Sequence, residues 1–423
     1  MKEMERDTLC IHAGYKPGNG QPRVAPIVQS TTYTYESSQE MGDLFDLKAD
    51  GFFYTRLGNP TNDCVEKKIA ALEGGVGALV TSSGQAASLM SVLNICTAGQ
   101  HMVCSAAIYG GTFNLFYKTL QEMGVEVTFV PASSTLEELQ AAMRENTRCV
   151  FAETLSNPAL VVTDLEVFAQ AAHGHGVPLI VDNTFPTPIN CRPIEFGADI
   201  VIHSTTKYMD GHAVQVGGVI VDSGRFDWDN GKFPALTEPD ESYHGVVYTK
   251  QFGPAAYIAK ARCHLMRDLG AQAAPMNAFL LNLGLETLAL RMERHCQNAQ
   301  KAADFLQADP RVAWVNFPGL AGSPYYELAK KYLPHGSCGV VSFGIKGGRE
   351  AAQRFMDSLE MASVVTHVAD LRTCVLHPAS TTHRQLSERQ LEEAGVPGDL
   401  IRLSVGIENP GDIIADLKQA LEK

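Results

Sequence analysis

Polar residues follow three short apolar runs of the sequence and could together bind an anion, a cation and a carbonyl carbon. The runs lead into Ser82–Ser83–Gly84–Gln85, into Asp182, and into Ser204, Thr206 and Lys207. Such runs are typical of buried strands, and an open parallel sheet binds its ligands beyond the carboxyl ends of its strands. A turn that opens a helix points free amides at an anion such as phosphate. The spacing therefore predicts an anion site, a carboxylate and an amine at one edge of a sheet.

Lys207 and Asp182 limit the kinds of ligand that this site could bind. Lys207 stands directly behind an apolar run, where desolvation lowers the pKa of an amine and makes it a nucleophile. Asp182 is costly to bury without a cationic partner. Pyridoxal phosphate (PLP) matches this set, because it carries a phosphate, a ring nitrogen that must stay protonated, and an aldehyde that condenses with lysine. The alternatives are a structural ion pair between the two residues and an ordinary strand-helix connection at Gly84.

The elements that must position these residues alternate along the chain. A helix is indicated from Pro60 to Gly74–Gly75, since proline favours a first helical turn and glycine the end of a helix. Seven apolar runs then recur, most of them separated by amphipathic segments: GALVTSS, HMVCSA, EVTFVP, RCVFAET, PLIVDNT, DIVIHST and GGVIVDS. Runs that stay apolar indicate strands covered on both faces. We therefore expect a mostly parallel, seven-stranded sheet in a three-layer α/β/α domain.

Three segments divide the chain. Residues 1–60 are rich in proline, glycine, threonine and tyrosine, which predicts an extended N-terminal arm. Residues 61–255 are predicted to form the large domain, and residues 256–423 a smaller α+β domain. Residues 225–245 form a polar, turn-rich insertion, which is either a loop at the mouth of a site or a plain surface excursion.

Composition excludes several classes of protein. The net charge of −13 argues against nucleic acid and anionic lipid as partners. No apolar stretch is long enough to span a membrane, and the charged start is unlike a signal peptide, so we expect a cytoplasmic protein. The 10 cysteines contain no C-x-x-C pair and predict reduced thiols. The histidines show no metal-ligand spacing beyond His173 and His175, and we expect no metal.

Several motifs occur in the order typical of one family. They are DIVIHSTTKYMDGH, YTRLGNPT, SSGQAA, YGGT, SNP, VDNTF, HPAST and IRLSVGIE. With them the chain resembles, over nearly its whole length, the fold-type I PLP enzymes of cysteine and methionine metabolism. That family includes cystathionine synthases and lyases, methionine γ-lyase and O-acetylhomoserine sulfhydrylase. Ala213 departs from the family pattern, which more often has glycine or a small polar residue there.

The resemblance implies a role for each motif residue. Lys207 would bond covalently to PLP, Asp182 would pair with the pyridine nitrogen, and Thr184 of the same motif would bind the cofactor. The phosphate would be held by Ser83, Gly84, Gln85, Ser204 and Thr206. Tyr109 would stack on the ring and assist catalysis, and Asn157 would meet the ring oxygen.

Two further implications concern the substrate and the assembly. Arg402 would grip the substrate α-carboxylate, although its apolar flanks also fit a buried structural salt bridge. Tyr54 and Arg56 would reach the phosphate of a neighbouring subunit, which makes the arm an inter-subunit clasp. The family implies a homo-oligomer, usually a tetramer built from dimers.

Three features resemble the sulfhydrylase branch of the family. They are Gly111 in YGGT, where methionine γ-lyases typically have cysteine, the polar insertion, and the stretch THVADLRTCVLHPASTTHRQL. The resemblance implies γ-replacement, in which O-acetylhomoserine and sulfide give homocysteine and acetate, and methanethiol gives methionine. The alternatives are methionine γ-lyase, cystathionine γ-synthase and, more remotely, a non-catalytic PLP-binding protein.

Overall fold

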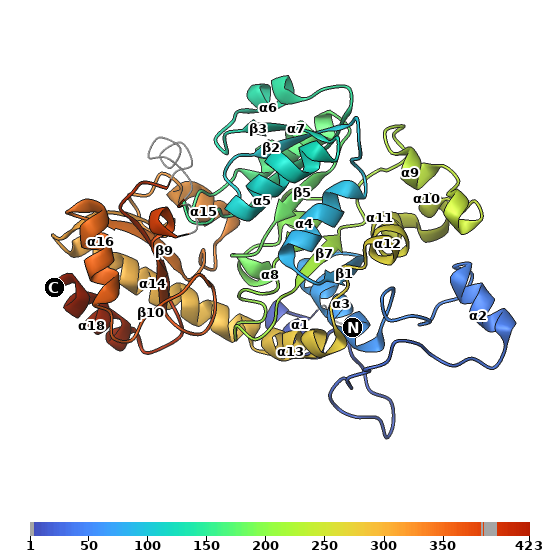
Figure 1. Ribbon diagram of the computed structural model, residues 1–423, viewed down its shortest axis with the longest axis horizontal. Coiled ribbons are helices and arrows are strands. Elements are labelled where there is room, and N and C mark those ends of the chain that lie inside the picture. The colour runs from blue at the N-terminus through green and yellow to red at the C-terminus, as the bar shows by residue number, and fades with distance from the viewer. Residues whose placement is uncertain (1–3, 382–383, 385–395) are drawn as a thin grey trace.

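Two β-sheets organise the protein in the computed structural model, which describes residues 4–381, 384 and 396–423 (Figure 1). The predicted stretch THVADLRTCVLHPASTTHRQL therefore lies only in part among the described residues, since 382–383 and 385–386 fall outside them. Within the described ranges, no helix combines the length and the apolar character that a membrane crossing requires.

The first sheet has the seven predicted strands, in the order β1-β7-β6-β5-β4-β2-β3. Their bounds are β1 (Gly77–Thr81), β2 (His101–Ser105), β3 (Glu126–Val130), β4 (Thr147–Glu153), β5 (Leu179–Asp182), β6 (Ile200–His203) and β7 (Gly218–Asp222). All neighbours pair in parallel except at β7, which runs antiparallel to both β1 and β6. The prediction of a mostly parallel sheet is confirmed. The carboxyl ends of β5 and β6 therefore meet at one edge, with Asp182 opposite Ile202.

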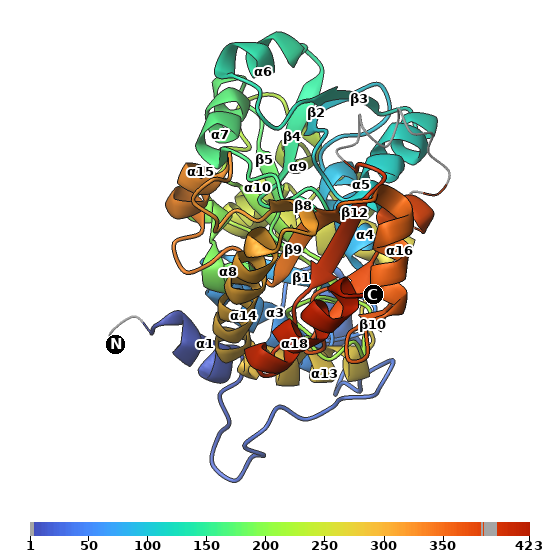
Figure 2. The same ribbon diagram turned by 90° about the vertical axis from the view of Figure 1, so that its left-hand side faces the viewer.

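Helices cover both faces of this sheet (Figures 1 and 2). They are α3 (Pro60–Glu73), α4 (Gly84–Leu93), α5 (Gly110–Asn114), the π-helix η1 (Leu115–Leu120), α6 (Leu136–Ala142), α7 (Leu165–Gly174), α8 (Thr187–Asn190) and η2 (Pro193–Phe196). Helix α3 begins and ends as its sequence predicts. The Asn59 side chain caps its start, Pro60 is in the first turn, and Gly74 ends it in the left-handed region at φ 78°.

The second sheet has five strands in the order β10-β11-β12-β9-β8. They are β8 (Val312–Asn316), β9 (Val340–Ile345), β10 (Ser363–Val364), β11 (Cys374–Leu376) and β12 (Leu400–Ser404). Around them lie α15 (Tyr326–Tyr332), α16 (Gly348–Asp357), η6 (Pro378–Ser380) and α18 (Pro410–Leu421). This part has the α+β character that the sequence predicts.

The segment between the two sheets is helical. It contains α11 (Ala256–Lys260), the π-helix η5 (Ala261–Met266), α12 (Arg267–Leu269), α13 (Pro275–Glu286) and α14 (Leu288–Ala308). Apolar side chains from Ala256 to Cys296 belong to the core of the seven-stranded sheet, and the core of the second sheet begins at Ala299. Figure 1 shows α14 leading from beside α13 to the C-terminal elements. Packing thus favours a division inside α14 and not at residue 255.

The N-terminal arm is irregular over much of its length but contains α1 (Arg6–His12) and α2 (Ser38–Phe45). Helix α1 packs against α3, α13 and α14, with Cys10 buried. The chain after α1 then loops away from the body in both ribbon views (Figures 1 and 2). The arm is therefore packed against the large domain at α1, and the rest of it is largely exposed.

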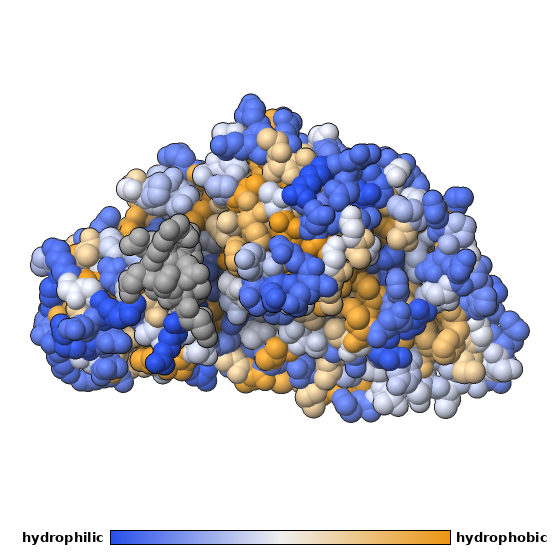
Figure 3. Space-filling model, turned by 45° about the horizontal axis from the view of Figure 1, so that its top comes forward, coloured by the Kyte–Doolittle hydropathy of each residue, from blue (hydrophilic) through white to orange (hydrophobic). Residues whose placement is uncertain are grey.

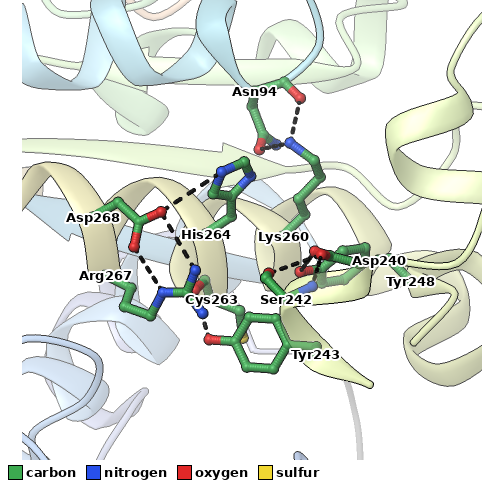
Figure 4. Close-up of polar contacts among 10 residues, drawn as sticks. All are labelled: Asn94, Asp240, Ser242, Tyr243, Tyr248, Lys260, Cys263, His264, Arg267 and Asp268. Atoms are coloured by element: carbon green, nitrogen blue, oxygen red, sulfur yellow. Dashed lines mark hydrogen bonds and ion pairs between the residues drawn. The ribbon is translucent and has the colours of Figure 1, made fainter. Parts of the chain in front are cut away.

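The polar insertion at 225–245 folds onto the helices after β7. It contains α9 (Pro234–Thr237) and η3 (Glu241–Tyr243), and α10 (Tyr248–Phe252) and η4 (Gly253–Ala255) follow it. Figure 4 shows its contacts with η5 and α12: the Tyr243 hydroxyl donates to the Cys263 carbonyl at 2.7 Å, and the Arg267 guanidinium lies 4.8 Å from the Tyr243 ring centre. Elsewhere, hydrophilic residues cover much of the face in Figure 3, with hydrophobic patches between them.

Candidate active site

Lys207 lies one turn beyond the end of β6, where its backbone N–H bonds to the Ser204 carbonyl at 3.3 Å. Burial of its amine, followed by the nearby Arg402 charge, lowers the Lys207 pKa to about 8. Cys374 and Asp370 act in the opposite direction and raise the Lys207 pKa. Among the described residues no ion pair joins Lys207 to Asp182, so the structural alternative for the lysine is not observed. The amine is thus prepared for nucleophilic attack near neutral pH.

Asp182 ends β5 and is 8% exposed. Its Oδ1 accepts two hydrogen bonds from Thr184, from the backbone N–H at 3.0 Å and from the hydroxyl at 2.5 Å. The Thr184 hydroxyl in turn accepts the Ser204 N–H at 2.9 Å. Burial raises the Asp182 pKa, and the Thr184 bonds oppose that rise. No cationic side chain of the described residues pairs with Asp182, so the carboxylate suits a protonated ring nitrogen.

The residues predicted to hold the phosphate lie where α4 begins beside the end of β6. Ser83 caps α4, accepting the Ala86 N–H at 3.1 Å. Gly84 faces Ser204 so closely that a Cβ on Gly84 would lie 2.6 Å from the Ser204 Cβ. The first turn of a helix leaves amides without intrahelical partners, and these favour an anion. The close approach therefore forms a cradle of the kind a phosphate requires.

Two other predicted phosphate ligands already have protein partners. Thr206 exchanges bonds with Gly217, donating its hydroxyl to the carbonyl at 3.1 Å and accepting the N–H at 3.0 Å. Gln85 accepts the Thr112 hydroxyl at 3.1 Å through its Oε1 atom. These bonds fix the start of β7 and the first turns of α4 and α5 around the cradle.

Tyr109 precedes α5 and presents a side chain that is 48% exposed. Its backbone N–H donates to Glu153 Oε2 at 2.7 Å. Burial raises the Glu153 pKa well above its usual range. The tyrosine ring leans over Gly111, where an added Cβ would lie 2.5 Å from Tyr109 Cε1. Sequence reasoning missed Glu153, although its place at the end of an apolar run is a usable signal.

Arg402 projects from β12 of the second sheet toward this edge of the first. Its Nη1 donates to Asn157 Oδ1 at 3.3 Å, and its Nη2 donates to the carbonyls of Thr366 at 3.2 Å and His367 at 3.0 Å. Its Nε is buried without a hydrogen-bond partner. Burial lowers the Arg402 pKa to about 10. No carboxylate of the described residues pairs with it, so the alternative of a structural salt bridge is not observed.

His367, Asp370 and Cys374 also surround Lys207 and Arg402, and sequence reasoning gave them no role. His367 Nε2 lies 3.7 Å from Asp370 Oδ2, and Cys374 Sγ donates to the His367 carbonyl at 3.6 Å. Burial and then the Lys207 charge lower the His367 pKa to about 4, so this imidazole is neutral at pH 7. The only available signal was their position just before HPAST.

Tyr54 and Arg56 lie outside this group. The Arg56 guanidinium lies 5.2 Å from the centre of the Tyr54 ring, which is 39% exposed. No contact of the described residues joins either side chain to Lys207, Asp182 or the Gly84 turn. Arg56 instead approaches Gly270, where an added Cβ would lie 3.9 Å from its Cδ. The Arg267 hydrogen bond and, more weakly, the Arg56 charge lower the pKa of Asp268.

Metal-binding features are missing from the described part of the chain. No group of three or more His, Cys, Asp or Glu side chains there could hold a metal ion. His173 pairs with Asp199 at 2.8 Å, and His175 bonds to the Arg144 carbonyl at 2.8 Å. All ten cysteines are free thiols.

The class of protein follows from the fold and this site together. The family model of the Cys/Met metabolism PLP-dependent enzymes matches residues 7–422. The chain therefore belongs to this family of PLP-dependent enzymes, and its α/β architecture is that of fold type I.

Individual relatives match over the full length. The O-acetyl-L-homoserine sulfhydrylase of Leptospira meyeri is 45% identical over 100% of this chain and 97% of its own. O-acetyl-L-homoserine sulfhydrylase 1 of Thermus thermophilus is 46% identical over 99% of this chain and 100% of its own. A crystal structure from Campylobacter jejuni, described as a putative O-acetylhomoserine (thiol)-lyase with N'-pyridoxyl-lysine-5'-monophosphate at position 205, superposes with a TM-score of 0.96. It is 38% identical and covers 99% of this chain and 100% of that one.

The residues present fit PLP. Asp182 is a buried carboxylate without an ion-pair partner among the described residues, Lys207 is a partly buried amine of low pKa, and the Gly84–Ser204 contact leaves room for no side chain beside the first turn of α4. The ring nitrogen, the aldehyde and the phosphate of PLP would each satisfy one of these features.

Proposed function

We propose that the protein catalyses γ-replacement on O-acetylhomoserine, in which sulfide gives homocysteine and acetate. Methanethiol in place of sulfide gives methionine. The reaction class is supported by one observation above all: the low-pKa amine of Lys207 lies near the buried guanidinium of Arg402, which forms no ion pair with a carboxylate of the described residues. The choice of substrate is supported by full-length relatives that are named for it at 45% and 46% identity.

Each side chain has a separate task in this proposal. When bound, PLP supplies an aldehyde that condenses with amino groups and a protonated ring that stabilises negative charge at the substrate Cα. Arg402 holds the substrate α-carboxylate, so the Cα–H bond is directed at Lys207. Lys207 Nζ, once free, takes the Cα proton as a base. Asp182 keeps the ring nitrogen protonated, with Thr184 holding its Oδ1.

Loss of the acetate from Cγ requires a second deprotonation, at Cβ. In the proposal Tyr109 assists this step, since its half-exposed ring lies at the start of α5, on the same edge as Lys207. The thiol then bonds to Cγ in place of acetate. If no thiol adds at Cγ, hydrolysis at Cα would instead release an α-keto acid and ammonia, which is the lyase outcome.

Turnover of the holoenzyme tests the proposal. We expect acetate release from O-acetylhomoserine that depends on added sulfide, with homocysteine formed in equal amount. Comparison of sulfide, methanethiol and cysteine as acceptors identifies the thiol. Keto acid formed from methionine at comparable efficiency would favour methionine γ-lyase, cystathionine from cysteine would favour the synthase, and no turnover with a bound cofactor would favour a binding protein.

The proposal extends to assembly and location. The protein works as a homo-oligomer, a tetramer built from dimers, in which residues 1–60 clasp a neighbouring subunit and bring Tyr54 and Arg56 to its phosphate. This assignment is supported by the exposure of the arm after α1. It is also supported by the lack of contact, among the described residues, between Tyr54 or Arg56 and the Lys207 site of the same chain. The acidic composition supports a cytoplasmic enzyme that does not bind nucleic acid.

A further inference from the structure

A buried polar cluster lies behind the ends of β5 and β6 and has no part in the chemistry described so far. Glu73 is the last residue of α3, His203 is the last residue of β6, and Asn183 directly follows β5; all three are 0% exposed. His203 Nε2 lies 2.6 Å from Glu73 Oε1, and Asn183 Nδ2 donates to the same oxygen at 3.2 Å. One carboxylate oxygen therefore joins the ends of two neighbouring strands.

These hydrogen bonds are made by the sequence neighbours of two predicted cofactor-binding residues. Asn183 is the residue after Asp182, and His203 is the residue before Ser204. On the cofactor side the same two ends are already joined, because the Ser204 N–H donates to Thr184, which donates to Asp182. The Asn183 N–H also donates to the Ile202 carbonyl at 2.9 Å. Each strand end is thus held from both sides.

The cluster is costly to fold, which argues against a role as ordinary core. Glu73 Oε2, His203 Nδ1 and Asn183 Oδ1 are buried without hydrogen-bond partners. Buried ionic and polar groups are often matched or exceeded in stability by apolar side chains of similar volume. A hydrogen bond fixes the distance and the angle between two groups, whereas a packing contact between apolar side chains does not.

We propose that Glu73, His203 and Asn183 form a positioning clamp that sets the separation between Asp182 and Ser204. That separation decides whether the ring nitrogen and the phosphate of one PLP molecule can be held at once while its aldehyde faces Lys207. The three residues do not touch the cofactor and act through their neighbours in the chain. The inference rests on the proposed roles of Asp182 and Ser204 in cofactor binding.

A matched pair of histidine variants tests the clamp. His101 is also 0% exposed in the same sheet, but it begins β2 at the opposite edge, where its ring bonds to Thr147 at 2.8 Å and Thr128 at 2.9 Å. His203→Met and His101→Met thus remove comparable buried bonds at the two edges. For each full-length apo-protein, we would measure the unfolding midpoint and the Kd for PLP by titration of the visible absorbance.

We expect His203→Met to raise the Kd for PLP at least about tenfold, and His101→Met to change it less than about twofold at a similar loss of apo-protein stability. Glu73→Gln keeps an acceptor for both partners and should bind PLP within about threefold of the wild type, while Glu73→Met should follow His203→Met. Equal Kd values for the two histidine variants would overturn the clamp.

Asn183→Leu serves if His203→Met does not fold, since it breaks the β5 side of the clamp together with the Asn183 Nδ2 bond to the Cys191 carbonyl at 2.9 Å. It should raise the Kd for PLP about threefold or more, and an unchanged Kd would again overturn the proposal. Cofactor affinity is measured without substrate. A wild-type protein that binds PLP but does not turn over O-acetylhomoserine would therefore refute the proposed reaction while leaving the clamp tested.

Discussion

At the scale of single residues the site is defined by two cations, the partly buried Lys207 and the buried Arg402, neither of which forms an ion pair with a carboxylate of the described residues. Lys207 and Arg402 lie close enough for the arginine to lower the lysine pKa, and burial depresses the pKa of both groups. Such a site is electrostatically incomplete and attracts anions, which in the proposed function include the carboxylate of the amino-acid substrate. The same imbalance keeps Lys207 reactive.

The pH dependence of cofactor attachment tests the state of Lys207. A lysine of ordinary pKa 10.5 is neutral in only about one molecule in three hundred at pH 8, whereas a pKa of about 8 leaves about half neutral. The rate at which apo-protein combines with PLP should therefore rise with pH, reaching half its maximum near pH 8. Stopped-flow absorbance from about pH 6 to about pH 10 measures it. A midpoint near 10.5 would contradict the assignment, and Arg402→Met, which removes a positive charge, should move the midpoint upward.

Arg402→Lys tests the grip on the substrate carboxylate. Lysine keeps the charge but loses the planar fork that binds a carboxylate through two parallel bonds. We expect the KM for O-acetylhomoserine to rise at least about tenfold, with a smaller effect on the Kd for PLP. Arg372→Lys, at an exposed position just before β11, is the control and should leave KM unchanged. A changed KM for both variants would point to a general loss of structure.

At the scale of elements, the first turns of α4 and α5 approach other parts of the site without room for a side chain. Gly84 meets Ser204 at the end of β6, and Gly111 lies under the Tyr109 ring. The two helix starts and the β5 and β6 ends thus converge on one edge of the sheet. At Gly84 the contact includes the Ser204 backbone, which favours glycine, whereas at Gly111 it is made by side chains that can move.

Gly111→Ala tests whether the start of α5 positions Tyr109. The new Cβ would lie 2.5 Å from Tyr109 Cε1, so the ring must turn away while the helix itself is preserved. We expect kcat to fall by about tenfold or more, with little change in unfolding temperature, because a half-exposed ring can move without disturbing the core. Gly174→Ala, with open space around the position, is the control. Unchanged kcat would show that the Tyr109 position does not matter.

The whole molecule brings two separately packed sheets to one site. Arg402 reaches Asn157, the Ser342 hydroxyl donates to the Pro158 carbonyl at 2.6 Å, and Asn316 donates to the Ala159 carbonyl. The loop after β4 is therefore held by three residues of the second sheet. Substrate and cofactor contacts from the two parts are fixed relative to one another by these bonds.

Mixed oligomers test whether the arm completes a neighbouring site. Lys207→Ala and Arg56→Ala subunits are each expected to be nearly inactive alone. In a mixed dimer, one site combines an intact Lys207 with an intact Arg56 from the other chain. Random pairing of equal amounts should therefore restore about a quarter of wild-type sulfhydrylase activity. Activity that stays at the sum of the two variants after refolding together would place Arg56 in its own subunit's site.

The sequence by itself determined the seven strands of the first sheet, the helix from Pro60 to Gly74 and the polar residues at and just beyond the ends of β5 and β6. These features are local, since an apolar run, a proline and a glycine record burial and backbone conformation within a few residues. The motif order also identified the family and its cofactor. The sites of Lys207 and Asp182 could be proposed because both belong to strand ends, whose place in an open sheet follows from topology.

Only the tertiary structure decided which distant residues meet. The bond of Arg402 to Asn157 crosses 245 positions, and the bond of His203 to Glu73 crosses 130. The segment from Ala256 to Cys296 has a helical pattern that fits either domain, and packing assigned it to the large core. Periodicity records which face of an element is buried but not against what. That choice depends on side-chain packing and chain topology across the whole fold.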